Sequence, residues 1–138
     1  MKNFFGNILK NSQNSKKILL IEQKISYGDF FSRTMFHFNF LKMNVKKGKV
    51  LCACLNYSLD YIAIIFACYL NKNILTFINP SASSGEKKHI LKNSGAIAVF
   101  YETNEFEIKN KTKLSDDIYF SKINSNTNSN LKPNDRFI

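Results

Sequence analysis

Three continuous apolar runs constrain the fold of this chain more than any other feature. They are "VLCACL" at 50–55, "ILTFIN" at 74–79 and "AIAVFY" at 96–101. Runs of this length without polar alternation are typical of strands that are covered on both faces. Parallel neighbours need a long crossover, and the segments between the runs are long enough to supply one. The order strand, helix, strand, helix, strand therefore predicts an α/β fold, with a βαβαβ parallel sheet and flanking helices.

The two segments between these runs carry helix signals. "SLDYIAIIFACYL" at 58–70 is apolar nearly all round, which predicts a buried helix. At 1.5 Å per residue it would reach only about 20 Å of the roughly 30 Å of bilayer hydrocarbon, so no transmembrane segment is predicted. Ser83 and Glu86 have the spacing of a capping box, and they predict a short helix that runs to about Lys92.

The segment before the first run predicts a small hairpin followed by an amphipathic helix. "KILLIEQ" and "KISYGDF" are separated by almost no turn, and Ser26 with Asp29 resembles a capping box. We expect a helix from Tyr27 to Met43, with His37 on the flank of its apolar stripe and not a metal ligand. Gly48 is expected in the turn that follows. The stripe consists of Tyr27, Phe30, Phe31, Thr34, Phe38 and Leu41.

The charge balance does not by itself indicate nucleic-acid binding. The chain has 20 basic and 10 acidic residues, a formal net charge of +10. However, Arg33 and Arg136 are its only arginines, and the lysines are scattered in short pairs. Arginine is the residue that reads bases and phosphates in bidentate fashion, and no known binding motif is present. Specific nucleic-acid binding is therefore not expected.

Cysteine usage favours a reducing compartment. The three cysteines include Cys52 and Cys54, two positions apart in an apolar run, which fits buried thiols. His37 and His89 do not complete a zinc-finger spacing with them, so no metal site is predicted. The N-terminal sequence lacks the apolar length and cleavage site of a signal peptide. The predicted location is the cytoplasm.

The chain changes character after residue 102. A polar, mixed stretch contains one candidate for a further short strand, "DDIYFSKI", and is followed by the Ser/Asn-rich linker "NSNTNSN". The chain stops at "LKPNDRFI", where Phe137 and Ile138 read as the start of a strand; we expect a cut here, because terminal strands need pairing to be ordered. The sequence thus predicts a polar lead-in at 1–16, an α/β subdomain at 17–102 and a polar extension and linker at 103–138.

A set of residues follows these elements in a recognisable order. They are Ser26, Tyr27, Val45, Gly48, Val50, Asn56, Ala63, Ala67, Asn79, Pro80, Glu86, Leu91, Ser94 and Gly95. Taken together over residues 17–102, they resemble the N-terminal part of the AMP-forming adenylating enzymes, the superfamily of acyl-CoA synthetases, peptide-synthetase adenylation domains and luciferases. The chain departs from that pattern at Lys49, where an acidic residue is common, and near Phe77, where proline is usual. A glycine is usual near Lys72, so a different backbone is expected in that turn.

The resemblance implies a reaction that these residues do not perform alone. Family members join a carboxylic acid to ATP with magnesium and usually pass the acyl group to a thiol such as coenzyme A. Asp135 to Ile138 resemble the lead-in to the family's phosphate loop, which, like the C-terminal catalytic lysine, would lie beyond Ile138. The segment most similar in composition to such a loop is "SASSG" at 81–85. The helix cap predicted at Ser83 already accounts for this segment, so a nucleotide-binding role is not expected.

We therefore name no catalytic, cofactor-binding or metal residue in this chain. Bound ATP, magnesium and coenzyme A, with the acid and thiol substrates, are implied for the complete enzyme and not for this chain alone. The chain is interpreted as an inactive N-terminal fragment of an acid–CoA ligase, truncated or completed by a separate chain. The alternative is a non-catalytic α/β binding or interaction module, since parallel strands alternate with helices in many unrelated proteins.

Overall fold

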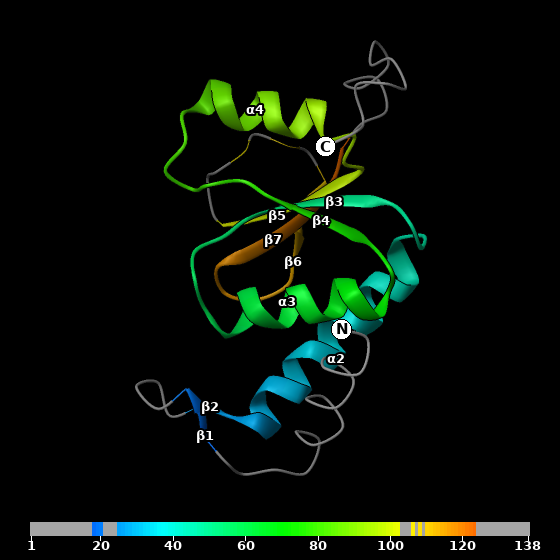
Figure 1. Ribbon diagram of the computed structural model, residues 1–138, viewed down its shortest axis with the longest axis vertical. Coiled ribbons are helices and arrows are strands. Elements are labelled where there is room, and N and C mark those ends of the chain that lie inside the picture. Colours follow the sequence, from blue (N-terminus) through cyan, green and yellow to red (C-terminus); the bar gives the residue numbers. More distant parts are fainter. Residues whose placement is uncertain (1–17, 21–24, 103–105, 107, 109, 124–138) are drawn as a thin grey trace. The chain divides into compact units, whose positions relative to one another are not determined.

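The computed structural model describes residues 18–20, 25–102, 106, 108 and 110–123 (Figure 1). They fall into two compact units, one formed by residues up to 47 and 57–72, the other by residues 48–56 and those from 73 onward. The elements in chain order are β1 (Ile18–Leu20), β2 (Ile25–Ser26), α2 (Tyr27–Asn44), β3 (Val50–Cys54), α3 (Leu59–Leu70), β4 (Ile74–Phe77), α4 (Ser84–Asn93), β5 (Ala98–Glu102), β6 (Thr112–Lys113) and β7 (Ile118–Lys122).

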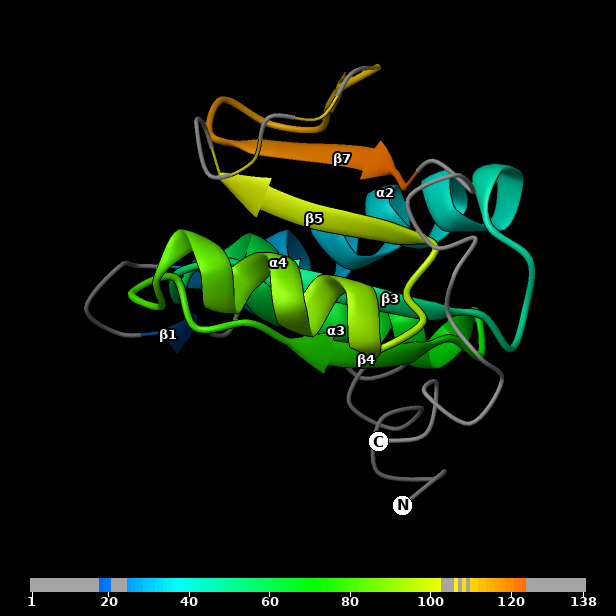
Figure 2. The same cartoon turned by 90° about the horizontal axis from the view of Figure 1, so that it is seen from above.

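A five-stranded sheet in the order β4-β3-β5-β7-β6 forms the centre of the second unit. β3 pairs in parallel with both β4 and β5, which confirms the predicted parallel strands. β7 confirms the strand expected in "DDIYFSKI"; it runs antiparallel to β5, as Figure 2 shows, and to β6. The sheet is therefore mixed. β6 was not predicted, because two exposed residues, Thr112 and Lys113, give no periodic signal.

The core of the second unit lies between this sheet and α4, which runs along one face of the sheet (Figure 2). Ile90 and Leu91 of α4 pack against the buried cluster. The hydroxyl groups of Tyr101 and Ser121 are both buried and lie 2.7 Å apart, so each has a partner. The cluster consists of Cys52, Cys54, Ile78, Ala96, Val99, Tyr101 and Phe106.

Burial of the strands follows their place in the sheet. β3 and β5 have partners on both sides and are almost wholly buried, as predicted. The prediction of a buried strand at 74–79 is wrong for β4, since Ile74 is 59% exposed, Phe77 is 47% exposed and the two residues between them are half-buried. Among the strands that the structure describes, β4 lies at the edge of the sheet and pairs with β3 alone, so an apolar run did not imply cover on both faces.

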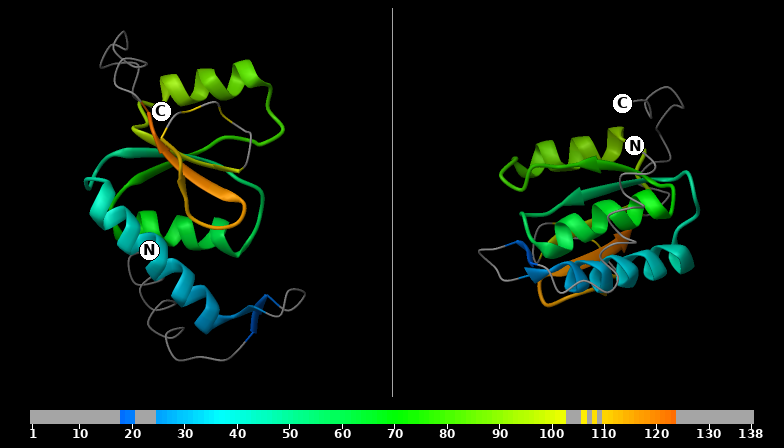
Figure 3. Two further views of the ribbon diagram at one scale, coloured as in Figure 1. Left: turned by 180° about the vertical axis from the view of Figure 1, so that it is seen from behind. Right: turned by 60° about the horizontal axis from the view of Figure 1, so that its bottom comes forward.

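The first unit is built on α2 and α3, which pack side by side (Figure 3). β1 and β2 form the predicted antiparallel hairpin, and α2 follows β2 directly. Ser26 and Asp29 make the predicted capping box, with both reciprocal hydrogen bonds present. Phe30 of α2 and Phe66 of α3 meet edge to face with ring centroids 5.0 Å apart. The helix pair thus has an aromatic core contact of its own.

α3 is the predicted apolar helix, and it is capped by Ser58, whose hydroxyl accepts a hydrogen bond from the backbone N–H of Tyr61. Its buried residues are Ala63, Ile64, Phe66, Ala67 and Cys68. Among the described residues, no helix combines the length and apolar character needed to cross a membrane.

Gly48 and Lys72 are two of the four described residues that adopt the left-handed backbone region. Gly48 has φ of 82°, in the turn where glycine was expected. Lys72, just after α3, has φ of 57°, although a side chain there is costly. A lysine therefore occupies a conformation that favours glycine, and the different backbone expected from the missing glycine stays a prediction.

Replacing Lys72 by glycine is expected to stabilise the chain by about 0.5–1 kcal/mol. The left-handed conformation costs an L-residue roughly 1–2 kcal/mol, and glycine's greater freedom in the unfolded chain offsets part of that gain. Urea unfolding followed by circular dichroism measures the difference. Lys49→Gly is the control, because Lys49 is exposed and lies outside the left-handed region; it should be neutral or destabilising.

Candidate functional site

The carboxyl ends of β3 and β5 form the natural place for a site in the second unit. From β3 the chain continues through α3 to β4, the neighbour of β3 on one side. From β5 it continues to β6 and β7 beyond the other side. In open α/β sheets, ligands bind outside the carboxyl ends of strands where the connections diverge in this way.

Asn56 and Glu102 meet at this edge. The Glu102 carboxylate accepts two hydrogen bonds from Asn56, one from the backbone N–H to Oε1 at 2.8 Å and one from the side-chain Nδ2 to Oε2 at 3.0 Å. Both carboxylate oxygens are engaged, so Asn56, the second residue after β3, is fixed to the last residue of β5. Asn56 is exposed and Glu102 is half-buried, which leaves the pair accessible from solvent.

This pair fixes the ends of two neighbouring strands relative to each other. The Glu102 carboxylate is held by two neutral donors, both from Asn56. Asn56 belongs to the residues that carry the family resemblance, whereas Glu102 was not singled out. Its partner lies 46 positions away, so the only available signal was an acidic residue at the end of a buried run.

The segment between β4 and α4 is organised by its own side chains. Asn79 Oδ1 accepts from the backbone N–H of Ser81 at 2.9 Å, which makes an Asx turn. Ser83 Oγ accepts from the backbone N–H of Glu86 at 3.2 Å and caps α4. The capping role predicted for "SASSG" is confirmed. That this loop does not hold a nucleotide stays a prediction.

A charged network links α2 and α3 within the first unit. His37 Nε2 and Asp60 Oδ1 lie 2.7 Å apart, and Arg33 Nε lies 3.5 Å from the same oxygen. His37 is completely buried, so its predicted place on the flank of the stripe is wrong. Its partner on α3 is 23 positions away and could not be read from the helix pattern alone.

The environment of Asp60 shifts its acidity. Burial alone would raise the pKa of Asp60, but the hydrogen bond with His37 and the electrostatic attraction of His37 and Arg33 outweigh that effect. The pKa of Asp60 therefore lies below its ordinary value, and the carboxylate is ionised at neutral pH. The network stabilises the contact between the two helices, and no cluster of three or more metal-ligating side chains is found among the described residues.

Two buried polar atoms of α2 have no hydrogen-bond partner among the described residues. They are Thr34 Oγ1 and His37 Nδ1, and both side chains are fully buried. A buried polar atom without a partner costs about 1–3 kcal/mol.

Thr34→Val is expected to raise the free energy of unfolding by about 1 kcal/mol, because valine keeps the shape and removes the unpartnered hydroxyl. Thermal or urea unfolding measures the change. Thr34→Ser is the comparison: it keeps the hydroxyl and loses a methyl group, and it should destabilise. A Thr34→Val variant less stable than the parent would show that the hydroxyl has a partner.

Two of the three cysteines are poorly suited to act as nucleophiles. Cys52, Cys54 and Cys68 are all buried, and none of them forms a disulfide among the described residues. Burial raises the pKa of Cys68 to about 12 and also raises the pKa of Cys52, although a hydrogen bond with Ser94 partly opposes the latter shift. A thiol must ionise to attack, so neither group is activated at neutral pH.

Comparison with known proteins bears on these observations. The family model described as "AMP-binding enzyme" matches residues 10–134. The chain belongs to this family. A search of curated protein sequences finds no significant match.

Several solved structures share the fold. The N-terminal domain of FACL13 from Mycobacterium tuberculosis is 16% identical at a TM-score of 0.59, with 69% of this chain and 26% of that chain covered. Coronafacic acid ligase from Pectobacterium brasiliense is 18% identical at a TM-score of 0.59, and the match covers 69% of this chain and 20% of that chain. O-succinylbenzoate coenzyme A synthetase from Bacillus subtilis, solved with AMP, is 17% identical at a TM-score of 0.55, and the match covers 65% of this chain and 25% of that chain.

These comparisons confirm the family resemblance and the α/β fold predicted from the sequence. This member of the AMP-binding family covers only 20–26% of the length of these solved relatives. The domain division at residues 16 and 102 and the absence of catalytic, cofactor and metal residues stay predictions. The linker at 124–130 and the lead-in at 135–138 lie outside the described residues.

Proposed function

We propose that this chain is the N-terminal part of an ATP-dependent, AMP-forming acid–thiol ligase, and that it does not form adenylates alone. The observation that supports this most strongly is the match of the AMP-binding enzyme family over residues 10–134. The solved relatives of similar fold are ligases and synthetases of acyl-CoA type, and one of them was solved with AMP.

The residue inventory supports a scaffold role. A phosphate cradle needs glycines, so that backbone N–H groups can approach the anion, together with hydroxyl and cationic side chains. The chain has five glycines, and none of them are clustered. In this proposal, the phosphate loop, the groups that hold magnesium and a C-terminal catalytic lysine come from sequence outside these 138 residues.

The substrates follow from the same proposal. The complete ligase would take ATP, a carboxylic acid and a thiol such as coenzyme A, with magnesium to offset charge that develops during adenylation. Within it, the Asn56–Glu102 pair would hold the carboxyl edge of the sheet in place. We further propose a cytoplasmic enzyme, which the three buried free cysteines support.

The DNA that follows the codon for Ile138 tests the proposal. Read in all three frames, it should encode a loop rich in Ser, Thr and Gly that ends in Lys-Gly. The protein extended through that reading frame should exchange pyrophosphate with ATP in the presence of a suitable acid. If the sequence beyond Ile138 is unrelated to such a loop, the proposal fails, and the non-catalytic binding module becomes the better interpretation.

A further inference from the structure

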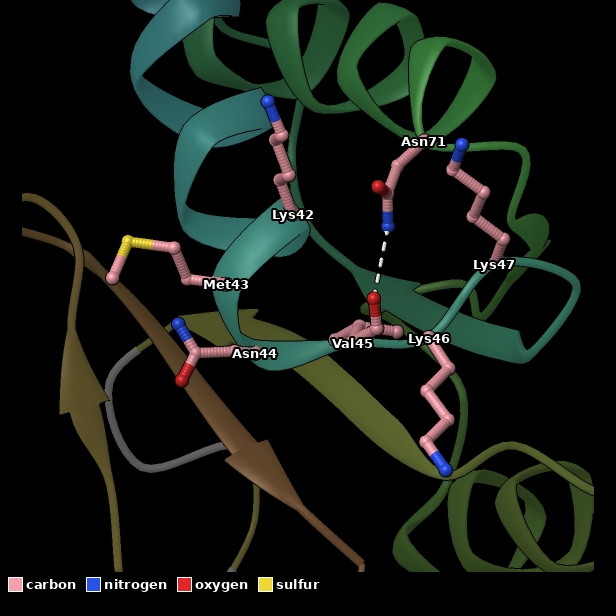
Figure 4. A pocket seen from close by; sticks show the side chains of 7 residues that line it. All are labelled: Lys42, Met43, Asn44, Val45, Lys46, Lys47 and Asn71. Carbon is pink, nitrogen blue, oxygen red and sulfur yellow. Dashed lines mark hydrogen bonds between the residues drawn. The ribbon is translucent and has the colours of Figure 1, made fainter.

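The end of α2 and the loop after it form a hollow with a basic lining (Figure 4). Its volume is about 400 Å³. Among the described residues that line it, three are lysines and none is acidic. Neither the Asn56–Glu102 pair nor the His37 network uses these side chains. The lining residues are Lys42, Met43, Asn44, Val45, Lys46, Lys47 and Asn71.

Hydrogen bonds fix the floor of this hollow. Asn71 is only 2% exposed, and its Nδ2 donates to the carbonyl of Val45 at 3.2 Å, as Figure 4 shows. The backbone N–H of Val45 donates to the Leu41 carbonyl at 2.8 Å, and Asn44 Nδ2 donates to the Phe40 carbonyl at 2.8 Å. Carbonyls at a helix C-terminus ordinarily repel anions. Because these three already accept hydrogen bonds, the lysine ammonium groups dominate the local field.

The three ammonium groups do not converge on one point. In Figure 4, the ends of Lys42 and Lys47 lie on the same side as Asn71, whereas the end of Lys46 points to the opposite side. Met43 projects from the last turn of α2 and is 86% exposed. In this arrangement no single phosphate contacts all three lysines. A ligand with several negative groups spaced along it fits the arrangement better.

We propose that this surface docks an acidic segment of a partner protein, with carboxylates beside Lys42 and Lys47 and an apolar side chain against Met43. Charge complementarity supports this occupant, both locally and through the net charge of +10. Methionine is enriched at protein interfaces. Lysine presents a mobile point charge rather than the rigid fork that suits bidentate phosphate binding. The proposal goes beyond the ligase function and does not depend on it.

Fluorescence polarisation with a labelled synthetic peptide tests the proposal on the full chain. The probe is a dodecapeptide with glutamates on either side of a central leucine. Exposed ion pairs are individually weak, so we expect saturable binding that weakens steeply as salt rises. The double variant Lys42→Gln/Lys47→Gln should bind about tenfold more weakly. Met43→Ser should also bind more weakly, with an unchanged salt dependence.

The matched control is Lys88→Gln/Lys92→Gln, which removes the same charge from exposed positions of α4. It should change the affinity less than twofold. Equal weakening by this control would show general attraction to net charge and overturn the proposal. Tighter binding of a single-stranded oligonucleotide, or full competition by inorganic phosphate at matched ionic strength, would overturn it in favour of a nucleic-acid or a compact anion site. Circular dichroism of each variant verifies that the fold is kept.

Discussion

Asp60→Ala is expected to lower the free energy of unfolding by about 2 kcal/mol at pH 7. The change removes the hydrogen-bond partner of His37 Nε2. His37 is fully buried, and its other ring nitrogen, Nδ1, already has no partner among the described residues. An unsatisfied buried group costs about 1–3 kcal/mol, and the loss of a carboxylate from the first turn of α3 adds about 0.3–1 kcal/mol. The Asp60 side chain is 15% exposed, so the larger penalty for a fully buried ion pair does not apply.

The pH dependence of this loss has a definite sign. The folded-state pKa of Asp60 is depressed below its ordinary 3.8. Its ionised form therefore adds stability at pH values above 3.8, and this contribution disappears as pH falls through the lower folded-state value. The difference between parent and Asp60→Ala should thus be largest near neutral pH and should narrow below about pH 4.

Urea unfolding at several pH values measures both effects. Asp60→Asn is the informative companion, because its amide oxygen can still accept from His37 while the charge is gone; its loss should be about half as large. Asp116→Ala removes an exposed carboxylate and should change stability by less than about 0.5 kcal/mol. An Asp60→Ala variant as stable as the parent would mean that the pair does not hold the helices together.

The parts of this fold that could be predicted from sequence are those set by local signals. The predicted caps at Ser26 and Ser83 each accept from a backbone N–H three residues later, so they are visible in a short window. The unbroken apolar runs located β3 and β5 because such a run is also a local signal, and both strands are almost wholly buried as the runs predicted.

The parts that could not be predicted depend on partners far along the chain. His37 is a buried residue because Asp60 faces it from α3, and Glu102 has a role because Asn56 follows β3. The exposure of Ile74 and Phe77 is set by strand order, which a run of apolar residues does not encode. No local pattern contains these relations. For the same reason, the sequence showed the lysines as scattered pairs and did not predict that Lys42 and Lys47 line one hollow.

Pyrophosphate release by the 138-residue chain alone is the measurement that tests the account most directly. The purified chain is incubated with ATP, magnesium, coenzyme A and a panel of short, long and aromatic carboxylic acids, and an established acyl-CoA ligase serves as the positive control. Adenylation needs preorganised groups around the phosphates, so without them no rate enhancement is available. We expect no pyrophosphate above the enzyme-free blank with any acid. Sustained, acid-dependent release by this chain would contradict the assignment of the phosphate-binding groups to sequence outside it.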